Sequence, residues 1–225
     1  SLRGERTTDT LKYRAVLFDM DGTILDTLED MTDSINAALQ EENFPERTLE
    51  EVRRFVGNGN RLLVARAVPE GTPEETVERV LQNFHKHYRT LCAVHTRPYE
   101  GVTGLLERLR AAGVRTAVIS NKADYAVQAL AVRYFPGLFD AVSGEKEGIR
   151  RKPAPDGVLA ALRTLGIDRK DAVYIGDSDV DVETARNAGL PCIAVAWGFR
   201  TEEVLRRSGA ETVVHTLDEL EAQLR

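Results

Sequence analysis

The stretch YRAVLFDMDGT, residues 13–23, constrains this chain most strongly, because an apolar run leads directly into two carboxylates, Asp19 and Asp21. The run over 14–19 is typical of a buried strand. Removing a carboxylate from water is costly unless a counter-charge or hydrogen bonds offset the cost. The stretch therefore predicts a site at the carboxyl end of this strand, completed by groups from elsewhere in the chain.

Short β-branched runs alternate with amphipathic stretches over much of the remaining sequence. This alternation is typical of a parallel sheet covered by helices on both faces, so we expect an α/β fold with a doubly wound parallel sheet. Glycines in LRAAGVR, LRTLGID and ARNAGLP predict where three of the helices end. The expected strands are 14–19, 114–120, 172–176, 192–196 and 212–215, and the expected helices are 101–112, 123–134, 155–165 and 180–188.

Residues 28–97 interrupt the alternation with helical patterning, broken at NFPERT, VGNG and VPEGTP. We expect an inserted all-helical cap over 28–97 and an α/β core made of 13–27 and 98–225, preceded by a flexible tail over 1–12. The insert leaves and re-enters the core close to the two aspartates, which favours a mobile cap over helices packed permanently on the sheet.

Composition excludes several other classes of protein. The net charge of −6 argues against a nucleic-acid partner, and no apolar run approaches the roughly 20 residues of a membrane span. Cys92 and Cys192 belong to no CxxC motif, which favours a reducing compartment. We therefore expect a cytoplasmic protein, either a monomer or a homodimer, with a small molecule as its partner.

Polar side chains follow several of the expected strands, and ligands of doubly wound sheets bind beyond the carboxyl ends of the strands. Carboxylates that converge there repel one another unless a cation with oxygen ligands, such as Mg²⁺, lies between them. A lysine and a seryl hydroxyl suit a phosphoryl group. The residues expected to converge are Asp19, Asp21, Ser120, Asn121, Lys152, Asp177 and Asp181.

Four motifs occur in a characteristic order: DMDGT at a strand end, Ser120 after the second strand, Lys152 before PAPD, and GDSDVD after a later strand. Together they resemble the haloacid dehalogenase superfamily of phosphohydrolases, over nearly the whole chain. The insert resembles the C1-type cap of that family, and VGNG with PAPD and GDS resembles its phosphoglycolate phosphatase branch. The resemblance implies a Mg²⁺-dependent phosphatase that hydrolyses a small phosphomonoester, 2-phosphoglycolate, through an aspartyl-phosphate.

The resemblance also implies roles for the charged residues. Asp19 would be the nucleophile, Asp21 the general acid and then the base, and Lys152 would reduce the charge on the phosphate. Mg²⁺ would be bound by Asp19, Asp177 and the backbone carbonyl of Asp21. Asp181 would hold metal-bound water or orient the other ligands.

Further residues are expected to contact the substrate or the acid. Ser120 and Asn121 would bind the phosphate, and Thr23 would steady Asp21.

In the cap loop RRFVGNGNRLL, Gly57 and Gly59 would let backbone approach the substrate. Asn58 or Arg61 would touch the non-phosphate end of the substrate. A simple interhelical turn is the alternative interpretation of this loop.

Three other functions remain open at this point. A sugar phosphomutase of the β-phosphoglucomutase type shares the cap and the DxDG core, and a pyrophosphatase or broad sugar-phosphate phosphatase fits almost as well. A non-enzymatic binding module on the same fold is disfavoured, because it would be expected to have lost Asp19, Asp21, Lys152 or Asp177, and all four are present.

Overall fold

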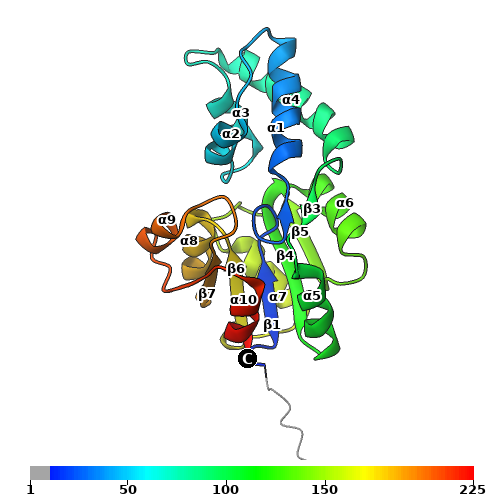
Figure 1. Cartoon of the computed structure of the whole chain (residues 1–225), viewed down its shortest axis with the longest axis vertical. Helices are drawn as coiled ribbons and strands as arrows, with labels where there is room; N and C mark the ends of the chain where they lie inside the picture. Colours follow the sequence, from blue (N-terminus) through cyan, green and yellow to red (C-terminus); the bar gives the residue numbers. More distant parts are fainter. Residues whose placement is uncertain (1–10) are drawn as a thin grey trace, which may run out of the picture.

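The structure is a computed structural model that describes residues 11–225. It has two lobes, a sheet lobe and a helical lobe at one end of it (Figure 1). The expected tail over 1–12 lies outside the described residues except for its last two, where the prediction is wrong. Leu11 packs against the core, and the backbone N–H of Lys12 donates to the carbonyl of Leu224 at 2.8 Å.

The sheet lobe contains a six-stranded parallel sheet in the order β5-β4-β1-β6-β7-β8. The first strand lies in the middle, paired on one side with β4 and on the other with β6. Such a central position places the carboxyl end of β1 where the strand order reverses, which is the ligand-binding position of this fold class. The strands are β1 (Ala15–Phe18), β4 (Arg115–Ala123), β5 (Ala141–Glu145), β6 (Ala172–Gly176), β7 (Cys192–Val195) and β8 (Thr212–Val214).

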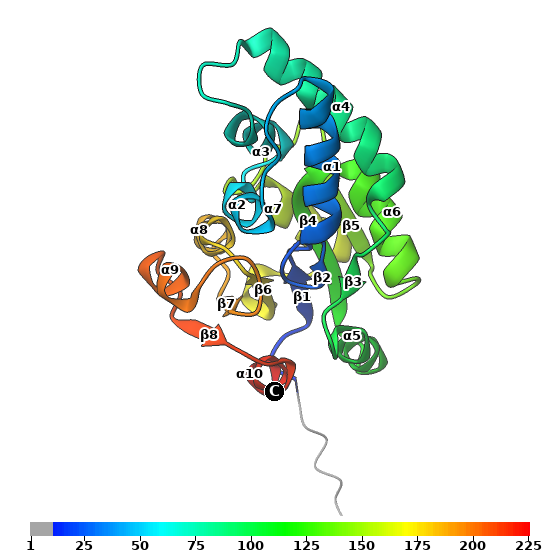
Figure 2. The same cartoon turned by 45° about the horizontal axis from the view of Figure 1, so that its top comes forward.

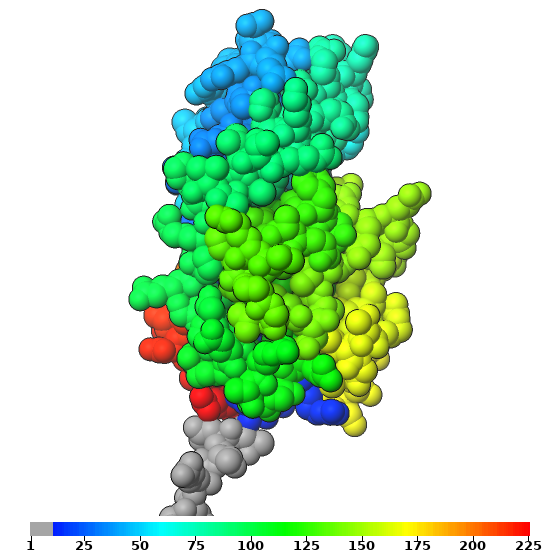
Figure 3. Space-filling model, turned by 90° about the vertical axis from the view of Figure 1, so that its right-hand side faces the viewer, coloured from blue at the N-terminus to red at the C-terminus, as the bar shows by residue number. Residues whose placement is uncertain are grey.

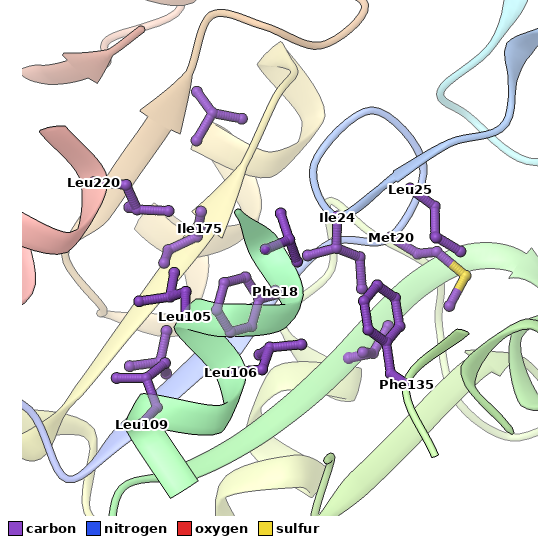
Figure 4. Close-up of a cluster of buried hydrophobic side chains, with 14 of the residues drawn as sticks. Phe18, Met20, Ile24, Leu25, Leu105, Leu106, Leu109, Phe135, Ile175 and Leu220 are labelled. Carbon is purple, nitrogen blue, oxygen red and sulfur yellow. The ribbon is translucent and has the colours of Figure 1, made fainter. Parts of the chain in front are cut away.

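Helices cover both faces of the sheet, and side chains of β1 alternate between them as the period of a strand requires. Val16 and Phe18 pack with the apolar faces of α5, α6 and α10, where Figure 4 shows Phe18 beside Leu105 and Leu106. Ala15 and Leu17 pack with α7 and α8 on the opposite face. The helices of this lobe are α5 (Val102–Ala111), α6 (Asp124–Tyr134), α7 (Asp156–Leu165), α8 (Asp179–Ala188), α9 (Glu202–Arg207) and α10 (Leu217–Leu224), with a 3₁₀ turn η1 (Arg169–Asp171).

The helical lobe has a hydrophobic core in which α1 packs along α4, and Ala126 and Phe199 of the sheet lobe join it. Two short antiparallel strands, β2 (Leu25–Asp26) and β3 (Arg97–Pro98), carry the chain out of and back into the sheet lobe side by side. The helices are α1 (Leu28–Glu41), α2 (Leu49–Phe55), α3 (Asn60–Ala67) and α4 (Glu74–Leu91). They stand over the carboxyl ends of the central strands (Figure 2).

The two lobes also meet along the side shown in Figure 3, where α4 lies against α6. Nδ1 of His85 is hydrogen-bonded to the hydroxyl of Tyr125 at 2.9 Å, and the guanidinium of Arg89 lies 4.9 Å from the centre of the same ring. Within residues 11–225, no helix is long and apolar enough to cross a membrane.

Several elements differ from the sequence-based expectation. β5, α9 and α10 were not expected, and β4 continues through 121–123, with a shift in its pairing to β5 after Ile119. β5 is an edge strand with mostly half-exposed side chains, so it carries little of the apolar pattern that reveals a buried strand.

Candidate active site

A small cavity of about 50 Å³ lies between the carboxyl ends of β1, β4 and β6 and the helical lobe. Its walls include four carboxylates and three cationic side chains, with apolar side chains and backbone on the helical side. The lining residues include Asp19, Asp21, Met31, Val56, Gly57, Gly59, Asn60, Leu63, Ser120, Asn121, Lys122, Lys152, Asp177, Asp181 and Arg200. The structure thus brings most of the expected site residues to one place.

Asp19 is the first residue after β1 and lies at the bottom of this cavity, with its backbone N–H held by the carbonyl of Ile175 at 2.9 Å. Burial raises the pKa of its carboxyl well above the ordinary value, and the negative charge of Asp181 raises it further. The ammonium of Lys152 opposes these effects from 2.9 Å. Asp19 is therefore a buried carboxylate that needs more positive charge than the described residues supply.

Lys152 lies in the loop before α7, and its side chain lines the cavity. It donates to Asp19 at 2.9 Å, to Asp181 at 2.9 Å and to the hydroxyl of Tyr174 at 2.8 Å. Burial lowers the pKa of a lysine, but the two carboxylates outweigh burial here and hold the pKa of Lys152 above its ordinary value. The lysine is thus a fixed positive charge beside Asp19.

Both carboxylate oxygens of Asp181 accept hydrogen bonds. One oxygen accepts from Lys152 and from the hydroxyl of Tyr174 at 2.7 Å, and the other accepts from Ser178 Oγ at 2.9 Å and from two backbone N–H groups. Burial would raise the pKa of Asp181, but Lys152 and these hydrogen bonds lower it below the ordinary value. Its contacts orient Lys152 and begin α8 through a capping box with Ser178.

Asp177 follows β6 and faces Asp19 across the cavity. Burial, and next the charge of Asp181, raise its pKa to about 6. Thr23 Oγ1 donates to one oxygen at 3.2 Å and the N–H of Phe199 to the other at 2.9 Å. Thr23 therefore contacts Asp177, and the expectation that it steadies Asp21 is wrong. The turn at Gly22, with φ of 82°, sends Thr23 to that side, and a Cβ on Gly22 would collide with the Asp177 carboxylate.

Thr27 and Lys122 hold Asp21, and neither was expected from the sequence. The hydroxyl of Thr27, the residue before α1, donates to the carboxylate at 2.5 Å. The ammonium of Lys122 lies 3.0 Å from the same oxygen. Lys122 lies two residues after Ser120 on β4, which ends at the site. This position is the sequence feature that could have identified it as a site residue.

Asn121 lines the cavity, and its side chain also holds the loop that carries Lys152. Its amide nitrogen donates to the carbonyl of Lys152 at 2.9 Å, and its oxygen accepts the N–H of Lys152 at 2.8 Å. The side chain thus fixes the loop that carries the lysine. Ser120 does line the cavity, and its oxygen accepts the N–H of Lys122 at 3.1 Å, which leaves the hydroxyl hydrogen to be donated.

The loop 56–60 brings Gly57 and Gly59 to the cavity, as expected, while Asn58 turns away. The side chain of Asn58 accepts from Arg66 at 3.1 Å. Arg61 pairs with Glu74 and Glu78 on the outer surface. The expectation that Asn58 or Arg61 touches the substrate is therefore wrong for this arrangement of the lobes.

Arg200, which follows β7, also lines the cavity and was not expected from the sequence. Its guanidinium donates to the carbonyls of Arg53 at 2.9 Å and Val56 at 2.5 Å, at the end of α2. It therefore ties the sheet lobe to the loop that covers the cavity.

The acidic residues fit a cation with oxygen ligands. Asp19, Asp177 and Asp181 place carboxylate oxygens within 4.8 Å of one another, and all three are buried. Burial, and next the charge of Asp181, raise the pKa values of Asp19 and Asp177, so both buried carboxyls favour a nearby positive charge. Asp181 has its counter-charge in Lys152.

Comparison with known proteins identifies the family of this chain. A model of the haloacid dehalogenase-like hydrolase family matches residues 16–195. The phosphoglycolate phosphatase of Aquifex aeolicus is 33% identical over 187 residues, 83% of this chain and 86% of that protein. That of Caulobacter vibrioides is 36% identical over 215 residues, 93% of this chain and 90% of that protein.

Solved structures show the same fold. A crystal structure from Lactobacillus delbrueckii subsp. bulgaricus, provisionally named a phosphoglycolate phosphatase, has a TM-score of 0.90 and 41% identity over 95% of this chain and 99% of that one. CbbY from Rhodobacter sphaeroides in complex with phosphate has a TM-score of 0.75 and 26% identity over 94% of this chain and 99% of that one. The chain therefore belongs to the haloacid dehalogenase-like hydrolase family, and within it to the phosphatases.

Proposed function

We propose that this phosphatase hydrolyses 2-phosphoglycolate with Mg²⁺, through an aspartyl-phosphate (an acyl phosphate) on Asp19. The observation that carries the proposal is the placement of Asp19 at the bottom of a cavity of about 50 Å³, 2.9 Å from the Lys152 ammonium and beside buried acidic partners. A cavity of this size favours a short substrate, since pockets for larger ligands enclose roughly 300–1,000 Å³. The relatives named phosphoglycolate phosphatase support the choice of substrate.

In the first step, an oxygen of Asp19 attacks phosphorus while the bond to the leaving oxygen breaks. A carboxylate is a weak nucleophile, so the phosphate it attacks must carry less negative charge, and the ammonium of Lys152 is placed to reduce it. Asp21 gives its proton to the leaving alkoxide. The products of this step are glycolate and a phosphoryl group on Asp19.

In the second step, water attacks phosphorus and the bond between phosphorus and Asp19 breaks. Asp21 takes the proton of the attacking water and is thereby ready for another cycle. Thr27 and Lys122 hold the Asp21 carboxylate in place for both transfers. The hydroxyl of Ser120 donates a hydrogen bond to the phosphate.

The residues that would hold Mg²⁺ are Asp19 and Asp177, together with the backbone carbonyl of Asp21. The raised pKa values of Asp19 and Asp177 support this assignment, because burial and the charge of Asp181 raise both, and a bound cation would offset that cost. When bound, Mg²⁺ supplies positive charge that offsets the oxygens of the phosphoryl group. Asp181 completes the set by orienting Lys152.

We propose that residues 28–97 act as a cap that opens and closes over the core of residues 13–27 and 98–225. The cap has a hydrophobic core built mostly from its own helices, and both chain crossings lie together at β2 and β3, which gives it a narrow hinge. Closure places Met31, Val56 and Leu63 over the site and excludes bulk water.

A sugar-phosphate substrate is the second candidate, since CbbY from Rhodobacter sphaeroides has been solved with xylulose-1,5-bisphosphate, at 25% identity to this chain. A panel of substrates separates the candidates: phosphate release with Mg²⁺ from 2-phosphoglycolate, pyrophosphate, several sugar phosphates and p-nitrophenyl phosphate. β-Glucose 1-phosphate is followed for isomerisation as well. We expect 2-phosphoglycolate to have the highest kcat/KM.

Asp19→Asn is the matched control, since it keeps the shape of the side chain and removes the nucleophile. It should release phosphate no faster than a buffer blank while unfolding as cooperatively as the parent. A preference for a sugar phosphate would reject the proposed substrate. Isomerisation without phosphate release would make the protein a mutase.

A further inference from the structure

Lys122 has one uncommitted donor in the cavity. Its side chain is 4% exposed, and its ammonium lies 3.0 Å from Asp21 and donates to the hydroxyl of Tyr88 on α4. The ring of Tyr88 also stands against it, 4.2 Å from ammonium to ring centre. An ammonium has three N–H donors. Among residues 11–225 two of them have partners, and the side chain lines the cavity, so the third is left for a ligand.

The other two cations of the cavity contact groups other than Asp21. All three donors of Lys152 go to Asp19, Asp181 and Tyr174. Arg200 donates to two backbone carbonyls and lies 3.6 Å from Asp179. Of the cations in the described part of the chain that line this cavity, Lys122 is the one paired with Asp21, and it has a donor left.

The place of Lys122 relative to Asp21 limits what it can contact. Asp21 is the proposed proton donor to the leaving oxygen, so an ammonium 3.0 Å from its carboxylate lies on the leaving-group side of the site. In 2-phosphoglycolate one methylene separates the leaving oxygen from the carboxylate. A leaving group this short puts its carboxylate beside whatever cation adjoins the acid.

We propose that Lys122 is the residue that recognises the carboxylate of the substrate's leaving group. Tyr88 is a positioning residue, because its hydroxyl and ring seat the ammonium when α4 lies over the sheet lobe. The cap thus contributes to recognition through a core lysine, without a charged side chain of its own on the cavity wall. This inference rests on the proposed function of the site, in particular on Asp21 as the acid.

The test compares three phosphomonoesters of one length that differ in the charge of the tail: 2-phosphoglycolate, 2-hydroxyethyl phosphate and O-phosphoethanolamine. The wild-type enzyme should prefer the carboxylate tail to the hydroxyl tail, and disfavour the ammonium tail most. In Lys122→Met, the ratio of kcat/KM for 2-phosphoglycolate to that for 2-hydroxyethyl phosphate should fall about 10- to 100-fold, mainly through KM. Lys122→Arg should retain part of the ratio.

The ratio is the useful readout because Lys122 also holds Asp21. Loss of that contact slows all three esters alike and cancels in the ratio. A Lys122→Met enzyme that is slower with every ester but keeps the wild-type ratio would overturn the inference. Tyr88→Phe keeps the ring and removes the hydroxyl, so it should lower the ratio by less than Lys122→Met.

The wild-type enzyme alone also decides the question if a variant fails to fold. Equal kcat/KM for the carboxylate and ammonium tails would overturn the role of Lys122. A wild-type enzyme that prefers sugar phosphates tenfold or more over all three esters rejects the proposed substrate instead, and the order among the three tails still reports the charge beside Asp21.

Discussion

Lys152 and Asp181 form an ion pair of 2.9 Å in which both side chains are buried, and Tyr174 bonds to both members. The ammonium of Lys152 also pairs with Asp19 at 2.9 Å. A buried pair of this kind contributes little when complete but leaves a costly lone charge when one partner is removed. Its geometry therefore ties the stability of the protein to the placement of its proposed catalytic lysine.

Asp181→Asn should lower the free energy of unfolding by about 2 kcal/mol, because Lys152 loses one of its two buried counter-charges and keeps Asp19. Urea unfolding followed by circular dichroism measures this change. Asp179→Asn is the matched control two residues away, where the pair with Arg200 is 3.6 Å long and half exposed. That variant should change stability by less than about 0.5 kcal/mol. Equal effects of the two variants would contradict the importance assigned to the buried pair.

Removal of divalent cations with EDTA should abolish phosphate release, and added Mg²⁺ should restore it. Asp177→Asn should raise the Mg²⁺ concentration for half-maximal rate at least about tenfold, since it removes one of the two proposed carboxylate ligands. Asp33→Asn, an exposed aspartate of α1, should leave this concentration unchanged. Full activity in excess chelator would contradict the assignment of a metal.

The raised pKa of Asp177 predicts how stability varies with pH in the presence of EDTA. The folded state binds the proton with a pKa of about 6, against the ordinary value of 3.8. Because the folded protein binds this proton more tightly, the stability it contributes is complete below the lower value and is lost as pH rises through about 6. Asp177→Asn has no such titration. The wild-type protein should therefore lose about 3 kcal/mol relative to this variant over that range, as measured by urea unfolding at several pH values. A constant difference would contradict the raised pKa.

Thr27 should be a positioning residue for Asp21, because its hydroxyl donates to the carboxylate at 2.5 Å from the start of α1. Thr27→Val keeps the volume and removes the donor, so kcat for 2-phosphoglycolate should fall about tenfold. Thr27→Ser keeps the hydroxyl and should recover most of the rate. Steady-state kinetics across pH checks the role, since a residue acting only on stability would leave the pH profile of kcat unchanged.

The fold followed from the sequence wherever apolar patterning was strong. The strands within the runs at 14–19 and 172–176, β1 (Ala15–Phe18) and β6 (Ala172–Gly176), are buried along their whole length and lie in the middle of the sheet. β5 escaped prediction because an edge strand has half-exposed side chains and a weak pattern. α9 is only six residues long and shows too few turns for a helical period to be evident.

The convergence of Asp19 and Asp177 could also be anticipated from the sequence, whereas Lys152, in the loop before α7, was expected from its motif. Parallel strands bring their carboxyl ends to one edge, so residues placed directly after strands must meet there. Chain order and strand direction are enough for that conclusion.

The sequence by itself thus determined the α/β class, the edge of the sheet that carries the site and the family of the protein. The tertiary structure alone decided which side chains hold one another: Thr23 contacts Asp177, Asn121 contacts the backbone of Lys152, and Lys122 contacts Asp21. These partners depend on turn geometry and on contacts between segments far apart in the chain. A hydrogen bond requires placement within a few tenths of an ångström, and only the packed protein fixes positions that closely.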